Sequence, residues 1–87
     1  MPAQTFNYTA LAPRVEEALR RHKFPKDIVE VSEGYLGRVH VLVVSPQLNG
    51  LTEEQKQNTI WEILKAELAD GAQGVSLVIA YGTDELR

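Results

Sequence analysis

Residues 38–45 read RVHVLVVS, the most apolar stretch of the chain. A short apolar run bounded by polar turns is typical of a strand at the centre of a sheet. We therefore predict that this stretch forms the central strand. The fold then depends on what pairs with it on either side.

The segment before the central strand predicts a second strand. In DIVEVSE at 27–33, Val29 and Val31 alternate with the residues around them. Only GYLG at 34–37 separates the two strands, so we expect an antiparallel hairpin. GYLG also has the form of the GxxG loop that clamps nucleic-acid backbone in KH domains. That loop joins two helices, so its place between two strands favours a simple hairpin turn.

A helix is predicted before this hairpin. Apolar residues at helical spacing run from 11 to 22, and Pro13 suits a first helical turn. The helix should end before Pro25, because the residue preceding a proline avoids the helical conformation. Residues 1–8 are mostly polar and show no clear period. We predict a flexible N-terminal segment over 1–8 and a single domain over 9–87.

A second helix is predicted after the central strand. Thr52 and Gln55 have the spacing of a capping box, which should open the helix. Gly71 or Gly74 would supply the left-handed residue that stops it. The apolar stripe expected to be buried comprises Ile60, Ile63, Leu64 and Leu68, with Trp61 on its edge.

VSLVIAY at 75–81 predicts the third strand, and TDEL at 83–86 a last helical turn. A right-handed crossover through the second helix would lay this strand parallel to the central one. The fold class is therefore α+β, an α/β sandwich of order α-β-β-α-β with helices on one face of a three-stranded mixed sheet. The covered face is expected to carry Val29, Val31, Val39, Val41, Val43, Val75, Leu77 and Ile79. The open face is expected to carry Ile28, Glu30, Ser32, His40, Leu42, Val44, Ser76, Val78 and Ala80.

The open face is half apolar, which makes it a candidate contact surface, including for a homodimer; scattered exposed aliphatic residues are the plainer interpretation.

Composition excludes several classes of protein. The 87 residues include no cysteine, which excludes a disulfide framework, a thiolate zinc site and a cysteine nucleophile. The start of the chain lacks the pattern of a secretory signal, and no apolar run is long enough to span a bilayer. We expect a cytoplasmic protein without membrane association.

Five basic residues lie in and just after the first helix. They are Arg14, Arg20, Arg21, Lys23 and Lys26. Cations near the carboxyl end of a helix interact favourably with its dipole, which explains them without a ligand. The alternative is a patch that contacts nucleic-acid phosphates or an acidic partner. The net charge of −3 limits any such nucleic-acid binding to a weak, salt-dependent interaction.

No catalytic or metal-binding constellation is evident. The junction VVSPQLNGLT at 43–52 resembles a phosphate loop in outline, but Glu53 and Glu54 would repel a phosphate there. Ser45 has no base to activate it, and the two histidines, His22 and His40, show no paired spacing. We predict no enzymatic activity, no metal and no cofactor.

The strand and loop VHVLVVSPQLNG at 39–50, the helix that follows and the closing strand with its TDEL tail resemble the BolA-like proteins. VEEALRRHKFPKDIVEVSEGY at 15–35 resembles the first helix and strand end of that family. The similarity spans roughly residues 14–86. It implies a class II KH-like fold and a binding or regulatory role with a monothiol glutaredoxin as partner, in iron or stress regulation.

The resemblance places the family motif on Leu48, Gly50, Lys56, Gln57 and Gln73, a candidate partner surface. The family has an aromatic residue where Leu48 stands and Arg-His where Lys56 and Gln57 stand. Members that share an iron–sulfur cluster carry a ligand histidine in the region of Gln73, and an amide is a poor substitute. The second ligand, expected around 32–38, is also missing, so the chain should hold no cluster with its own side chains. The alternative function is a KH-like nucleic-acid-binding module that uses the basic residues and the open sheet.

Overall fold

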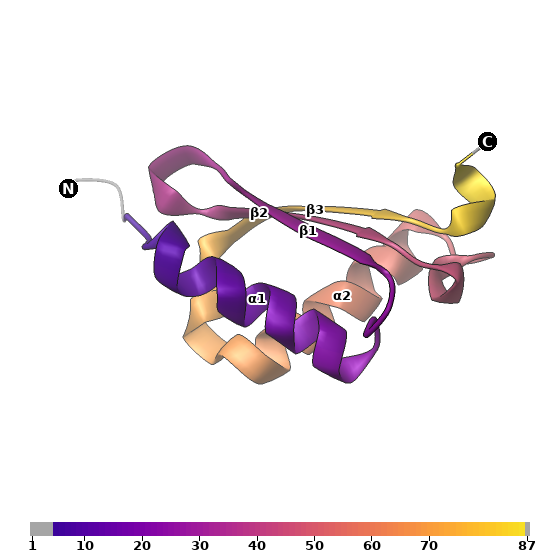
Figure 1. The fold of residues 1–87 in the computed structure, drawn as a ribbon, viewed down its shortest axis with the longest axis horizontal. Helices are drawn as coiled ribbons and strands as arrows, with labels where there is room; N and C mark the ends of the chain where they lie inside the picture. Colours follow the sequence, from indigo (N-terminus) through magenta and orange to yellow (C-terminus); the bar gives the residue numbers. More distant parts are fainter. Residues whose placement is uncertain (1–4, 87) are drawn as a thin grey trace.

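The computed structural model describes residues 5–86 and has the predicted order α-β-β-α-β (Figure 1). The elements are α1 (Tyr8–His22), β1 (Ile28–Glu33), β2 (Val39–Val44), α2 (Glu53–Leu68) and β3 (Val75–Tyr81). The central strand β2 pairs antiparallel with β1 and parallel with β3. Both helices lie on the same side of the sheet (Figure 1). The predicted α+β class, with a three-stranded mixed sheet covered on one face, is confirmed.

The β1–β2 connection is a tight hairpin, as GYLG predicts. The Gly34 N–H donates to the Arg38 carbonyl at 2.7 Å. Leu36 and Gly37 both have positive φ, 57° and 76°, which turns the chain. The N-terminal segment crosses this turn, because the Phe6 N–H donates to the Leu36 carbonyl at 2.8 Å.

Helix α1 begins three residues earlier than the sequence predicts. Asn7 provides the reason, since its side chain accepts a hydrogen bond from the Ala10 N–H and caps a helix that starts at Tyr8. Pro13 consequently lies inside the helix and not in its first turn. Of the N-terminal segment predicted to be flexible, residues 1–4 lie outside the described residues.

Helix α2 has the predicted start and a different end. Thr52 and Gln55 form the capping box, with N–H···O distances of 3.1 and 2.9 Å. The stop at Gly71 or Gly74 was wrong, because Ala69 takes the positive φ of 49°. Gly74 serves close packing instead, since a Cβ there would collide with the Leu11 side chain.

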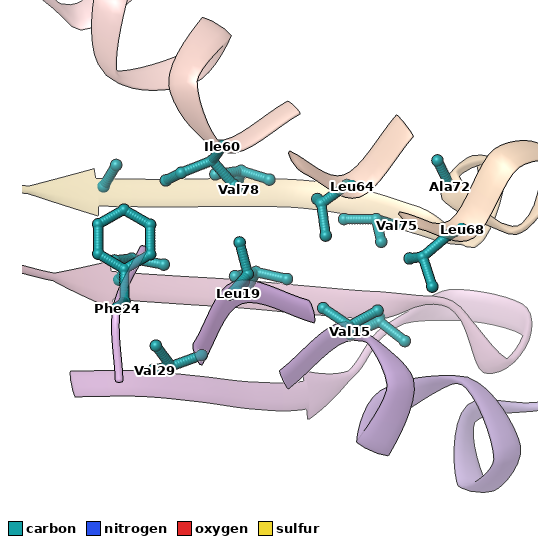
Figure 2. Packing of buried hydrophobic residues seen from close by; sticks show 14 of the residues in the cluster. Val15, Leu19, Phe24, Val29, Ile60, Leu64, Leu68, Ala72, Val75 and Val78 are labelled. Carbon is teal, nitrogen blue, oxygen red and sulfur yellow. The ribbon is translucent and has the colours of Figure 1, made fainter. Parts of the chain in front are cut away.

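The core fills the space between the helices and the sheet (Figure 2). Its fully buried side chains include Val15 and Leu19 of α1, Val39, Val41 and Val43 of β2, and Ile60 and Leu64 of α2. Phe24, just after α1, and Leu48, just after β2, close the core at the end where these segments meet. The apolar stripe of α2 is thus buried as predicted, with Ile63 and Trp61 only partly covered.

Strand β3 corrects the predicted faces. Val39 pairs with Val75, but His40 pairs with Leu77, so Ser76 is an extra residue in β3. Such a bulge reverses the alternation beyond it. Val78 and Ala80 are buried on the helix side, whereas Leu77 and Ile79, predicted to be covered, are on the open side.

Candidate interaction surface

The face of the sheet opposite the helices carries side chains from all three strands. In register across the sheet, from β1 through β2 to β3, these side chains form three rows: Ile28, Val44 and Tyr81; Glu30, Leu42 and Ile79; and Ser32, His40 and Leu77. We call these side chains the open face. Both α1 and α2 pack on the other side of the sheet (Figure 1), so no described helix covers this face, although Val44 is itself buried, 8% exposed.

The open face exposes several large apolar side chains. Ile28 is 50% exposed, Leu77 43%, Tyr81 40% and Ile79 38%. Three of these come from β3, which is the strand whose faces the bulge exchanges. The sequence pattern therefore missed the most apolar part of the surface, and no residue signals an extra position at Ser76 before the structure is known.

A hollow of about 560 Å³ borders this surface. Open-face residues from all three strands line it, together with Val29 and Val31 of β1, Val41 of β2 and Glu16 of α1, so it also reaches the β1 edge next to α1. Its two sides differ in chemistry. The β1 side presents Glu30 and Ser32, and the β3 side presents Leu77 and Ile79.

Both free edges of the sheet carry a hydrogen bond from a helix side chain. The Arg20 guanidinium donates to the carbonyls of Asp27 and Val29 at the β1 edge, at 3.0 and 3.4 Å. The Gln57 amide donates to the Val78 carbonyl of β3 at 2.8 Å. These carbonyls are therefore occupied and point away from β2.

The five basic residues do not form one free patch. Arg20 pairs with Glu16, and Arg21 pairs with Glu17 and with Glu67 of α2. The two i,i+4 pairs were readable from the sequence spacing, whereas the contact with Glu67 was not. Arg14 and Lys26 are exposed and Lys23 is partly exposed. Arg14, Arg20 and Arg21 belong to α1, which lies on the opposite side of the sheet from the open face (Figure 1).

The structure does not bring the family-motif positions together. Leu48 and Lys56 are buried, 1% and 3% exposed, and present no side chain to a partner. Gly50 is exposed near the start of α2, whereas Gln73 is exposed beyond its far end. Gln57 is partly buried and occupied with the Val78 carbonyl.

Lys56 is a charged residue that is buried, 3% exposed, which no sequence pattern predicted. Its ammonium lies 2.7 Å from Glu85 and 3.2 Å from Glu53. The hydrogen bond with Glu85 raises the pKa of Lys56 despite the opposing effect of burial. It also lowers the pKa of Glu85, whose carboxylate accepts from the Gly82 N–H as well. The pair fastens the C-terminal 3₁₀ turn, Thr83–Glu85, to the start of α2.

The strand-to-helix junction is a structural turn. Ser45 is fully buried, and its hydroxyl donates to Asp27 at 2.7 Å and accepts from the Gln47 N–H. The Gly50 N–H donates to the carboxylate of Asp84. A phosphate would meet an acidic side chain at this loop, in addition to the two glutamates that open α2.

The two histidines lie in different settings. His22 is hydrogen-bonded to Glu67 at 2.7 Å, and this bond is the main cause of a lowered pKa of Glu67. His40 is half-buried on the open face, against Gly34. Within residues 5–86, no three histidine, cysteine or acidic side chains converge as a metal site would require.

No helix of the described part of the chain has the length and apolar character needed to cross a membrane. Comparison of the chain with protein-family models, with curated proteins and with solved structures found no match.

Proposed function

We propose that the chain is a non-enzymatic protein-binding module whose contact surface is the open face. The observation that carries the proposal is the exposure of Ile28, Leu77, Ile79 and Tyr81 on an uncovered sheet. Contiguous exposed apolar side chains with a polar margin are typical of interaction surfaces. The margin here is polar, with Glu30 and Ser32 on the β1 side.

The chemistry of the open face favours a protein over a nucleic acid. Glu30 is an exposed carboxylate on this face, and it repels phosphates. No lysine or arginine is among the open-face residues, and their only rings available for stacking on bases are Tyr81 and the half-buried His40. The exposed cation Arg14 belongs to α1, which lies on the opposite side of the sheet from this face (Figure 1).

An enzymatic role finds less support in the same residues. Ser45 is inaccessible to a substrate, since it is fully buried. His22 is engaged with Glu67, and His40 has no carboxylate hydrogen-bonded to it among the described residues. General acid–base or nucleophilic catalysis needs such groups to converge on an accessible point.

We also propose a monothiol glutaredoxin as the first candidate partner, following the resemblance to BolA-like proteins. The partner and its thiol cofactor would hold any iron–sulfur cluster without a ligand from this chain. The absence of cysteine and the amide at Gln73 support this division. The role in iron or stress regulation belongs to the same proposal.

The experiment is capture from a nuclease-treated native extract with three versions of the protein. The double variant Leu77→Asp, Ile79→Asp disrupts the open face, and Ala66→Asp is the matched control on the exposed side of α2. We expect a protein partner retained by the wild type and by Ala66→Asp but lost by the double variant. Equal retention by all three would contradict a role for the open face.

The glutaredoxin proposal has a spectroscopic test. A purified monothiol glutaredoxin with its cluster is titrated with this protein, and visible circular dichroism and sedimentation are recorded. We expect a complex without a change of cluster ligands. A ligand-exchange spectrum that survives His22→Ala, His40→Ala but disappears with Gln73→Ala would assign a cluster ligand to Gln73 and contradict the proposal.

A further inference from the structure

We propose that the occupant of the open face is a basic amphipathic helix of a partner protein. This inference rests on the proposed function, because it names the kind of partner that the same surface takes. It follows from three properties of the surface: its edges, its charge asymmetry and its dimensions.

The edges favour an occupant that lies on the face over a strand added at an edge. A partner strand would add to β1 or β3 through free backbone carbonyls and N–H groups. Arg20 already occupies the carbonyls of Asp27 and Val29, and Gln57 occupies that of Val78. An added strand would have to break these bonds, whereas an element lying on the face would leave them intact.

The charge asymmetry defines the chemistry of the occupant. Glu30 lies on the β1 side of the hollow, whereas the carboxylate of Glu16, which also borders it, is already paired with Arg20. Leu77 and Ile79 lie on the β3 side. A complementary surface therefore carries aliphatic side chains over β3 and lysine or arginine over β1.

The dimensions match a single helix laid along the strands. Neighbouring strands are about 4.8 Å apart, so side chains of β1 and β3 are separated by roughly 10 Å, the diameter of a helix with its side chains. β2 has six residues, which span about 20 Å. A helix of about 13 residues covers that length, with its apolar stripe over β2 and β3 and its basic flank over β1.

A second copy of this chain fits less well. The same face on a second molecule would bring no lysine or arginine to Glu30, since none is among the open-face residues. A face-to-face dimer would instead place more carboxylates in the interface without a cationic partner, which is unfavourable.

The test uses two 14-residue model peptides and the full chain labelled with ¹⁵N. One peptide is an amphipathic helix of leucine and lysine, and the other has glutamate in place of lysine. Binding is followed by amide chemical shifts and by calorimetry. Two charge reversals are compared: Glu30→Lys on the open face and Glu54→Lys, an exposed position in the first turn of α2.

We expect the leucine–lysine peptide to shift amides of β1, β2 and β3 and to bind about three- to tenfold more weakly to Glu30→Lys, because one attractive ion pair becomes repulsive. Glu54→Lys changes the net charge equally and should leave the affinity within about twofold. Equal weakening by both variants would mean general attraction to an acidic protein and would overturn the inference.

The remaining outcomes separate this inference from the proposed function. If the leucine–glutamate peptide binds the open face as tightly as the lysine peptide, the basic specificity is wrong while the surface stands. If the protein sediments as a dimer that Leu77→Asp dissociates, the occupant is a second copy and the inference fails. If neither peptide shifts the open face, a helical occupant is excluded, and the capture experiment alone decides the function.

Discussion

The two faces of the sheet are both rich in aliphatic side chains, yet they meet different surroundings. On the helix side, Val39, Val41 and Val43 are at most 1% exposed. On the other side, Leu77 and Ile79 remain 43% and 38% exposed. The difference shows that apolar content alone does not decide which face becomes the core. The helices cover one face, and the bulge at Ser76 determines which alternate residues of β3 point toward the helices.

Val78→Asp should break this comparison most strongly. Val78 is buried on the helix side of β3, so an aspartate there would place an unpaired charge in the core. We expect a loss of roughly 3 kcal/mol or more in the free energy of unfolding, measured by urea denaturation followed by circular dichroism. Ile79→Asp, at the next position of the strand and on the open face, should cost no more than about 1 kcal/mol. Equal losses in the two variants would contradict the faces that the bulge assigns to β3.

A leucine-to-alanine substitution on each side of the sheet measures the difference in burial between the two sides directly. Leu64→Ala, at a fully buried position facing the sheet, should cost about 2–5 kcal/mol. Leu77→Ala, on the open face, should change the free energy of unfolding by no more than about 0.5 kcal/mol. Similar losses in both variants, in the same urea titration, would mean that the open face is covered in solution.

Lys56 tests how the covered side tolerates a charge. Removing Glu85 leaves the buried Lys56 ammonium with only Glu53 as its partner, whereas Lys56→Met removes the buried charge itself. We therefore expect Glu85→Ala to lower the thermal midpoint more than Lys56→Met does. The pKa of Lys56 is raised, so its stabilising contribution is present below its ordinary value of 10.5 and is lost as the pH rises through the higher value in the folded protein. The ranking of the two variants should therefore hold at pH 7, and a reversed order would contradict the ion pair.

The smallest effect concerns the attachment of the two helices to each other. Glu67 of α2 binds Arg21 and His22 of α1, and its pKa is lowered, chiefly by His22. A carboxyl with a lowered pKa stabilises the fold above its ordinary value, 4.5, and loses that contribution as the pH falls through the folded value. Wild type should thus be slightly more stable than Glu67→Gln at pH 6, and the difference should shrink as the pH falls through the lowered pKa of Glu67. A difference that stays constant as the pH falls would assign the effect to packing.

Local patterns in the sequence were enough for the element order, the hairpin and the capping box of Thr52 and Gln55. Each of these depends on residues a few positions apart. The faces of β3 could not be predicted, because the bulge arises from how the strand meets β2 after a long crossover. The end of α2 at Ala69 was missed because a glycine was expected at the position of positive φ. Gly74 instead lies where a Cβ would collide with the Leu11 side chain.

The candidate site shows the same division. The sequence identified an apolar open face and named its β1 and β2 members correctly, including Ile28 and Leu42. It assigned Leu77 and Ile79 to the wrong side and gave Tyr81 no side. The contact between Arg21 and Glu67 was missed, because it joins residues 46 positions apart.

The chain contains a single tryptophan, Trp61. Its indole N–H donates to the Gln57 side chain at 3.2 Å, and the amide of Gln57 in turn donates to the Val78 carbonyl. The one strong fluorophore of the protein is therefore connected by these two hydrogen bonds to the outer edge of β3, on the helix side. Its emission should move to longer wavelength when α2 separates from that edge and stay unchanged when a partner settles on the opposite face. An unlabelled sample thus distinguishes loosening of the fold from occupation of its surface.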